Sequence, residues 1–89
     1  MLVPPEIVIY TTPFCFYCVR AKQLLGKKGV VFCEVDVSGD DAARERLREQ
    51  TGVRRVPQIF INGAFIGGHY ELAAMDRDGE LDRLLETPR

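Results

Sequence analysis

Apolar and polar residues alternate along this chain with two different periods, and the order of these periods predicts its fold. Short runs rich in β-branched and aromatic residues have the composition of strands, whereas longer segments carry apolar residues at helical spacing. The predicted strands are residues 6–10, 30–37, 58–61 and 64–67. The predicted helices are residues 15–28, 40–51 and 70–77, followed by a last turn or two that holds Leu81, Leu84 and Leu85.

The connections between the strands predict how they pair. The first two strands are joined by a helix, and such a β-α-β unit implies a parallel pair. The last two are joined by Asn62 and Gly63, and Asn-Gly between two apolar runs is a strong signal of an antiparallel hairpin. We therefore predict an α/β fold with a small four-stranded mixed sheet flanked by helices, formed by one domain over residues 1–89.

The first predicted helix separates its side chains into two faces. Phe16 falls on the polar face, where we expect it to be exposed, and Cys15 lies at the edge of the apolar stripe near the helix start. The members of the stripe, which we expect to face the core, are Phe14, Cys18, Ala21, Leu24 and Leu25. Cys33 lies inside the second strand and is predicted to be a small buried hydrophobe.

The charged residues argue against two classes of partner. Twelve basic side chains are balanced by thirteen acidic ones, and the net charge of −1 creates no field that would attract nucleic acid or an anionic membrane. No apolar run approaches the roughly 20 residues that span a bilayer. Residues 1–6 lack the basic and apolar segments of a signal peptide, so we expect a cytoplasmic protein.

The C-x-x-C motif formed by Cys15 and Cys18 is the main candidate for chemistry. It lies between a predicted strand and a predicted helix, where free N–H groups and the helix dipole favour a negative charge on the first sulfur. The thiolate is the form that attacks disulfides. A zinc site would need two further ligands, and the remaining Cys33 and His69 lack paired spacing. The motif therefore favours a redox pair, with a structural disulfide as the alternative.

Three motifs in this order resemble those of glutaredoxins, which have the thioredoxin fold. They are the C-x-x-C motif after the first strand, residues 56–63 before and through the hairpin, and Gly67 with Gly68 before the third helix. Residues 72–81 also match the end of the family's sequences, so the resemblance covers roughly residues 6–86. It implies a small dithiol oxidoreductase that uses glutathione as its co-substrate.

The resemblance implies a role for each matching residue. Cys15 would be the nucleophile and Cys18 the resolving thiol. Val56 would pair its backbone with the cysteine of glutathione, and Pro57 would be a cis-proline facing the disulfide. The residues that complete this implied site are Tyr17 beside the groove, Gly68, backbone N–H groups near His69 and Tyr70 for the γ-glutamyl carboxylate, and Glu71 for the γ-glutamyl amine.

Several positions depart from the family's pattern. Phe16 replaces the usual proline between the cysteines, and Thr12 replaces a basic residue that is often found there. Both changes bear on the stability of the Cys15 thiolate. The segment after Gly68 lacks one of the two usual acidic residues. Arg55 stands where threonine is common, and we expect it to compensate by contacting a carboxylate of glutathione.

The expected activity is the reduction of glutathionylated and disulfide-containing proteins by a monomer, with glutathione as the other partner. A first alternative is a carrier of a [2Fe-2S] cluster, which Cys15 from each of two subunits and two glutathiones would hold. Glutaredoxins that lack the proline replaced by Phe16 are more often able to bind such clusters. A second alternative is a redoxin that thioredoxin reductase reduces. The region of Gly67 and Gly68 argues against it, because a glutathione pocket would have no purpose there.

Overall fold

Four strands and four helices form the fold of residues 4–86, which are the residues that the computed structural model describes. The strands are β1 (Ile7–Thr11), β2 (Cys33–Asp36), β3 (Gln58–Ile61) and β4 (Ala64–Gly67). The helices are α1 (Phe16–Lys27), α2 (Asp41–Thr51), α3 (His69–Arg77) and α4 (Glu80–Glu86). The predicted order is confirmed, although β2 is shorter than predicted and the last turns form a separate helix.

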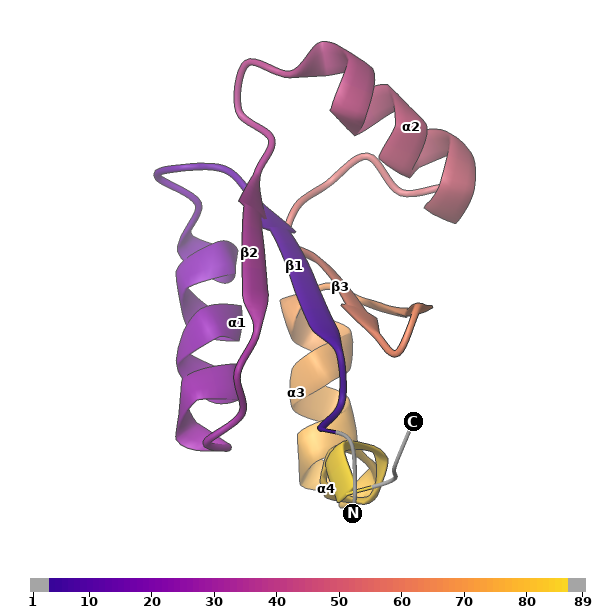
Figure 1. Cartoon of the computed structure of the whole chain (residues 1–89). Coiled ribbons are helices and arrows are strands. Elements are labelled where there is room, and N and C mark those ends of the chain that lie inside the picture. Colours follow the sequence, from indigo (N-terminus) through magenta and orange to yellow (C-terminus); the bar gives the residue numbers. More distant parts are fainter. Residues whose placement is uncertain (1–3, 87–89) are drawn as a thin grey trace.

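The strands form one mixed sheet in the order β2-β1-β3-β4 (Figure 1). β1 pairs in parallel with β2, to which α1 connects it, and it pairs antiparallel with β3. β3 and β4 form the predicted antiparallel hairpin. Its turn residues, Asn62 and Gly63, have positive φ angles of 52° and 82°, which an Asn-Gly hairpin turn requires. The predicted mixed sheet is therefore confirmed.

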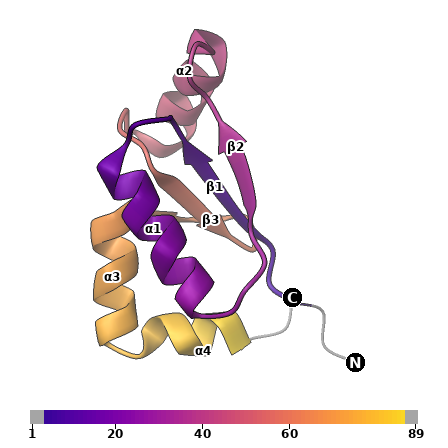
Figure 2. The same cartoon turned by 90° about the vertical axis from the view of Figure 1, so that its left-hand side faces the viewer.

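Each face of the sheet has its own hydrophobic core. The larger core lies between the sheet and α1, α3 and α4, and its buried residues are Ile7, Ile9, Ala21, Leu25, Ile59, Ile61, Leu72 and Leu81. On the other face, Leu47 of α2 packs with Val37 and Phe60. Figures 1 and 2 show α1 and α3 side by side, and α2 apart from them beyond the upper ends of the strands. Alternate residues of β1 reach the two cores because successive strand side chains point to opposite faces.

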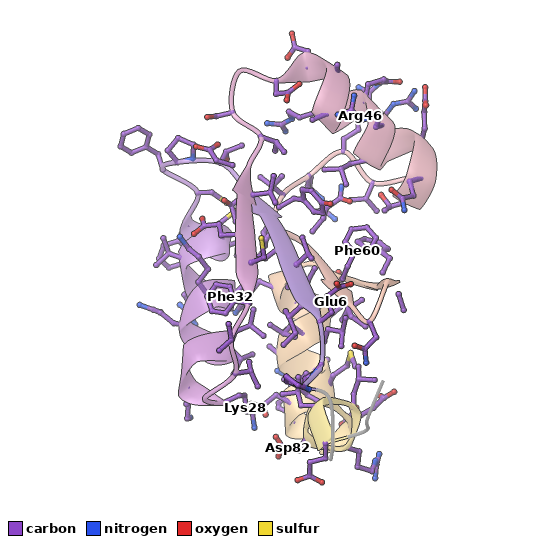
Figure 3. All side chains as sticks on the ribbon, in the orientation of Figure 1. Glu6, Lys28, Phe32, Arg46, Phe60 and Asp82 are labelled. Carbon is purple, nitrogen blue, oxygen red and sulfur yellow. The ribbon has the colours of Figure 1, made fainter. Side chains whose placement is uncertain are left out.

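An ion-pair cluster joins the end of α1 to α3 and α4. The Lys28 ammonium lies 2.5 Å from a carboxylate oxygen of Asp76 and 2.8 Å from one of Asp82. Figure 3 shows Lys28 and Asp82 close together below the strands. Hydrogen bonds from Lys28 to Asp76 and Asp82 raise the pKa of Lys28. The cluster fixes the helix that begins at the C-x-x-C motif against the two C-terminal helices.

Two predictions about individual side chains are wrong. Phe14 does not join the core, because its φ of 61° lies in the left-handed region and turns the chain before α1 begins, which leaves its side chain fully exposed. Cys33 is exposed rather than buried. Cys33 is the first residue of the edge strand β2, where it pairs with Val8. This end of β2 lies away from α2, so no helix covers Cys33 (Figure 1). Other members of the predicted stripe are buried, namely Cys18, Ala21 and Leu25.

Candidate active site

Cys15 occupies the N-cap position of α1, at the helix start where the sequence places it. Its backbone is extended, with φ −99° and ψ 110°, and its carbonyl oxygen accepts a hydrogen bond from the Val19 N–H at 3.1 Å. Its Sγ accepts a hydrogen bond from the Cys18 N–H at 3.2 Å. That N–H is one of the donors that a helix start leaves without an internal partner. The hydrogen bond and the helix dipole both stabilise a negative charge on the Cys15 sulfur.

The second cysteine of the motif, Cys18, points into the protein and is only 1% exposed. Burial raises the pKa of its thiol to about 12, and the hydrogen bond and charge of Cys15 add to the rise, whereas the Thr12 backbone and Lys22 oppose it. At neutral pH Cys18 is therefore a thiol. Because the thiolate is the nucleophilic form, the half-buried Cys15 is the sulfur that can attack a disulfide first.

The burial of Cys18 makes stability depend on pH. In the unfolded chain this thiol ionises near its ordinary pKa of 9.0, and in the folded protein near 12. Its contribution to stability is therefore complete below pH 9 and is lost as the pH rises toward 12. We expect urea titrations at several alkaline pH values to show a steeper fall in the free energy of unfolding for wild type than for Cys18→Ala. Cys33→Ala, which removes an exposed thiol, is the control, and parallel profiles for wild type and Cys18→Ala would contradict the raised pKa.

A groove with a volume of about 520 Å³ opens beside the C-x-x-C motif. The residues that the resemblance assigns to glutathione binding all line it, and they are Tyr17, Arg55, Val56, Pro57, Gly68, His69, Tyr70 and Glu71. Two further lining residues, Val53 and Phe65, carry no signal in the sequence beyond their apolar character. Segments from α1, the loop before β3, β4 and α3 therefore converge on one hollow.

The loop before β3 connects the groove to the first cysteine. The Val56–Pro57 peptide bond is cis, as the resemblance implies. The Cys15 Sγ lies 3.9 Å from the Val56 carbonyl oxygen, so residues 41 positions apart in the chain meet at this point. A molecule that occupies the groove along Val56 therefore lies next to the candidate nucleophile.

A buried glutamine, Gln58, holds this loop in its conformation. Its Nε2 donates hydrogen bonds to the carbonyl oxygens of Val53 at 2.7 Å and Arg55 at 3.1 Å, and its Oε1 accepts one from the Thr51 hydroxyl at 3.1 Å. A buried amide with satisfied hydrogen bonds constrains the backbone around it. Gln58 thereby positions Arg55 and Val56 at the groove, a role that no sequence pattern indicates.

The start of α3 forms the opposite wall of the groove. Gly67 has a φ of 126°, where residues with a side chain are strained. Gly68 is the N-cap residue, and its N–H donates a hydrogen bond to the Glu71 carboxylate at 2.8 Å. The N–H groups of His69 and Tyr70 follow in the first turn of the helix, where helices bind anions. The geometry therefore suits a ligand carboxylate at this end of the groove.

The His69 side chain also belongs to the groove, although the sequence suggests a role only for its backbone. Its ring centroid lies 6.0 Å from that of Tyr17, with an interplanar angle of 33°. Both residues line the groove, so an aromatic contact joins α1 to α3 across it. This contact depends on the packing of two helices that are far apart in the sequence, and no local pattern could reveal it.

Two exposed aromatic residues, Phe14 and Phe16, flank the first cysteine in the sequence. Phe14 is fully exposed, and Phe16 is 65% exposed, as predicted for its polar helix face. The Arg20 guanidinium lies 5.3 Å from the centroid of the Phe16 ring, so a positive charge flanks the apolar surface. Exposed apolar patches of this kind often contact other molecules.

Comparison with known proteins identifies the family. A family model described as Glutaredoxin matches residues 7–66. The chain belongs to the glutaredoxin family. It is 48% identical over 83 residues to the glutaredoxin of Pseudomonas aeruginosa, covering 93% of this chain and 99% of that one. It is also 48% identical over 81 residues to glutaredoxin 3 of Escherichia coli, covering 91% and 98% of the two chains.

Solved glutaredoxin structures share the fold. The chain matches the crystal structure of the buckwheat glutaredoxin–glutathione complex with a TM-score of 0.87 and 32% identity, covering 91% of this chain and 76% of that one. It matches the solution structure of glutaredoxin from Brucella melitensis with a TM-score of 0.84 and 43% identity, covering 97% and 91%. The predicted thioredoxin fold is therefore confirmed, and membership of the glutaredoxin family supports thiol–disulfide oxidoreductase function with glutathione.

Residues 4–86 offer neither a candidate membrane span nor a candidate metal site. None of the helices in this part of the chain has the length and apolar character needed to cross a bilayer. The same residues contain no group of three or more His, Cys, Asp or Glu side chains arranged to hold a metal ion.

Proposed function

We propose that this glutaredoxin uses glutathione to reduce protein–glutathione mixed disulfides and protein disulfides through Cys15 and Cys18. The position of the groove next to Cys15 supports this function. The groove that holds the residues expected to bind glutathione reaches the N-cap sulfur of α1, since Val56 lines it and the Val56 carbonyl oxygen lies 3.9 Å from the Cys15 Sγ. A glutathione whose cysteine pairs with the Val56 backbone would present its sulfur to Cys15.

The groove offers groups that complement both ends of glutathione. The N–H groups of His69 and Tyr70 would receive the γ-glutamyl carboxylate at the start of α3. The Arg55 guanidinium would meet the other carboxylate through charge-assisted hydrogen bonds. One oxygen of Glu71 accepts the Gly68 N–H, and its second oxygen would receive the γ-glutamyl amine.

Deglutathionylation needs Cys15 alone. Its thiolate attacks the glutathione sulfur of the mixed disulfide, and the substrate sulfur leaves with the electron pair and takes up a proton. A second glutathione thiolate then attacks the glutathione bound to Cys15, which releases oxidised glutathione and restores the Cys15 thiolate. The Cys18 N–H that contacts the Cys15 Sγ stabilises this sulfur both as nucleophile and as leaving group.

Reduction of a protein disulfide needs both cysteines. Cys15 first forms a mixed disulfide with the substrate protein, and Cys18 then attacks the Cys15 sulfur and releases the substrate thiol. Two glutathiones reduce the resulting Cys15–Cys18 disulfide. Glutaredoxin potentials of roughly −200 to −230 mV lie near the glutathione poise, so the direction would follow the redox state of the cell.

We further propose that the protein acts as a cytoplasmic monomer formed by one domain. One continuous sheet supports the single domain. The groove and both cysteines come from one chain, which supports activity without a second subunit.

A coupled assay tests the proposal. It follows the reduction of a small glutathione mixed disulfide while glutathione reductase recycles glutathione and oxidises NADPH, and we expect turnover that requires glutathione. Reduction by thioredoxin reductase in the absence of glutathione would instead support the redoxin alternative. Brown protein whose visible absorbance needs glutathione to persist would support the [2Fe-2S] carrier, with Cys15 as the ligand from this chain.

The exposed aromatic residues beside Cys15 would contact the substrate protein. We expect Phe16→Ser to lower kcat/KM for a glutathionylated protein about fivefold, because an aromatic contact of about 1 kcal/mol is lost. The kcat/KM for a small mixed disulfide should change by less than about twofold, because that substrate does not extend over the patch. Val31→Ser, which alters a side chain that is 89% exposed and outside the groove, is the control. Equal losses on both substrates would contradict a docking role.

A further inference from the structure

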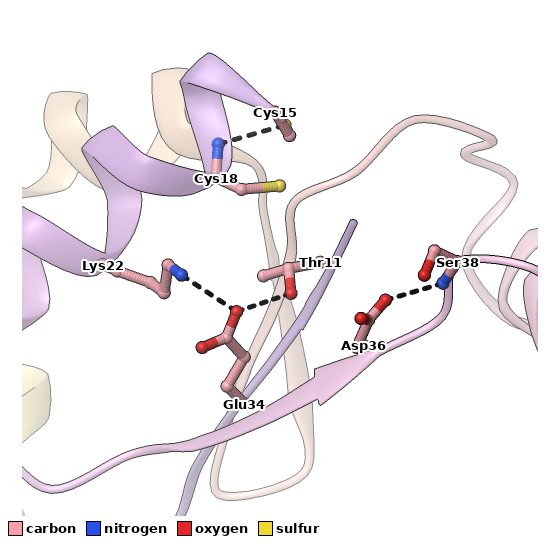
Figure 4. A network of polar contacts seen from close by, with 7 residues as sticks. All are labelled: Thr11, Cys15, Cys18, Lys22, Glu34, Asp36 and Ser38. Atoms are coloured by element: carbon pink, nitrogen blue, oxygen red, sulfur yellow. Dashed lines mark hydrogen bonds and ion pairs between the residues drawn. The ribbon is translucent and has the colours of Figure 1, made fainter. Parts of the chain in front are cut away.

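A polar network lies beneath the C-x-x-C motif, between α1 and the strands β1 and β2 (Figure 4). The Glu34 Oε2 accepts a hydrogen bond from the Thr11 hydroxyl at 2.7 Å and forms an ion pair with the Lys22 ammonium at 3.0 Å. Thr11 is buried, and the Lys22 side chain is 33% exposed. The shared carboxylate oxygen therefore holds the Lys22 charge against the strands instead of in open solvent.

Lys22 and Cys18 share one face of α1. They lie four residues apart in the helix, so their side chains are neighbours on its surface. Figure 4 shows both side chains projecting from α1 toward the strands that carry Thr11 and Glu34. Asp36, the other charged residue of β2 in this view, accepts a hydrogen bond from the Ser38 N–H at 2.8 Å. Lys22 is thus the cation of this cluster on the Cys18 face of the helix.

The thiolate form of Cys18 is destabilised by its surroundings. Burial and the hydrogen bond to Cys15 raise the pKa of the Cys18 thiol, whereas a hydrogen bond with the Thr12 backbone and the charge of Lys22 lower it. Cys18 is only 1% exposed, so water can contribute little to stabilising its thiolate. When Cys15 is bound in a mixed disulfide, its sulfur no longer carries a negative charge. The charge of Cys15 then no longer opposes the effect of Lys22 on Cys18, at the moment when Cys18 must attack.

We propose that Lys22, held by Glu34 and Thr11, is a positioning residue for the resolving step, in which its ammonium stabilises the negative charge that develops on the Cys18 sulfur. This proposal rests on the proposed function, in which Cys18 resolves the mixed disulfide. The bond between the Cys18 and Cys15 sulfurs forms, and the bond between Cys15 and the substrate sulfur breaks. The electron pair leaves with the substrate sulfur, and the Cys18 proton ends on the released substrate thiol. The cysteine pair is thereby oxidised and the substrate disulfide reduced.

Deglutathionylation supplies an internal control, because it does not use Cys18. We expect Lys22→Met to slow reduction of a protein disulfide about tenfold, because the charge that develops on the Cys18 sulfur loses its neighbouring cation, and to move the rate–pH profile of this reaction toward higher pH. Turnover of a small glutathione mixed disulfide should change by less than about twofold. Lys22→Arg, which keeps the charge, should restore most of the rate. Lys27→Met removes an exposed lysine near the end of the same helix and should change neither activity.

The two assays, run side by side on purified full-length variants, decide between a positioning role and a structural one. A selective loss in Lys22→Met, with rescue by Lys22→Arg, supports the proposal. Equal losses in both assays would overturn it, because a general defect of the fold affects both pathways. An unchanged rate of protein-disulfide reduction would also overturn it. A wild-type protein that fails to turn over the small mixed disulfide would instead refute the proposed function, so the two failures are distinguishable.

Discussion

Cys15→Ser is expected to lose both glutathione-dependent activities, whereas Cys18→Ser should retain deglutathionylation and lose the reduction of protein disulfides. The asymmetry follows from the different surroundings of the two sulfurs. Cys15 is half-buried at the start of α1 and accepts the Cys18 N–H at 3.2 Å, whereas Cys18 is buried and its pKa is raised to about 12. Because a serine hydroxyl cannot replace the attacking thiolate, we expect the rate of Cys15→Ser to fall on the order of a thousandfold or more.

Coupled assays with a small mixed disulfide and with a protein disulfide would measure this difference. Cys33→Ser is the matched control, since it replaces the exposed cysteine of β2 and should behave like wild type in both assays. Substantial activity in Cys15→Ser would rule out Cys15 as the nucleophile. Loss of both activities in Cys18→Ser would mean that Cys18 is needed even when glutathione resolves the intermediate.

Gly67→Ala is expected to weaken both folding and the use of glutathione. Gly67 has a φ of 126°, and an added Cβ would lie 2.6 Å from a carboxylate oxygen of Glu71 and 2.8 Å from the Glu71 Cβ. Relief of this clash requires Glu71 to move, and its bond to the Gly68 N–H closes the start of α3. We expect the free energy of unfolding to fall by about 1–3 kcal/mol. We expect KM for a glutathione mixed disulfide to rise about tenfold, because the N–H groups of α3 that we propose to receive the γ-glutamyl carboxylate are displaced.

Gly26→Ala is the matched control for this substitution. Gly26 lies inside α1, and an added Cβ would meet nothing within 4 Å. Because alanine is the better helix former, we expect Gly26→Ala to stabilise the protein by up to about 1 kcal/mol. Urea denaturation and steady-state kinetics on both variants provide the comparison. An unchanged KM in Gly67→Ala would show that the start of α3 does not bind glutathione.

The sequence predicted the fold well where the signals are local. The Asn62-Gly63 turn specified a hairpin, and the repeated periods of the apolar residues specified the order of the elements. The exposure of Cys33 lay beyond such signals, because it depends on β2 being an edge strand whose first residue no helix covers. Phe14 fitted the apolar stripe by spacing, yet its positive φ takes it out of the helix.

The sequence likewise predicted only part of the candidate site. The resemblance to glutaredoxin motifs predicted most of the residues that line the groove, because those motifs keep fixed positions relative to strands and helices. It did not indicate that Gln58 holds the loop at Val56 or that the His69 ring packs beside Tyr17. The Lys22–Glu34 pair joins a helix to an edge strand, and its partners are neighbours only once β1 and β2 have paired.

By itself, the sequence determined that a pair of cysteines lies at a strand-to-helix turn, and therefore that Cys15 is the one at the start of the helix. It also determined the order of strands and helices, because the hydrophobic period and the turn residues act over a few positions. Only the tertiary structure decided that the Val56 carbonyl lies 3.9 Å from Cys15, that Cys18 is 1% exposed and that Lys22 is held on its face of α1. These features arise from contacts between distant segments, and burial and charge act on a thiol only through the neighbours that packing provides.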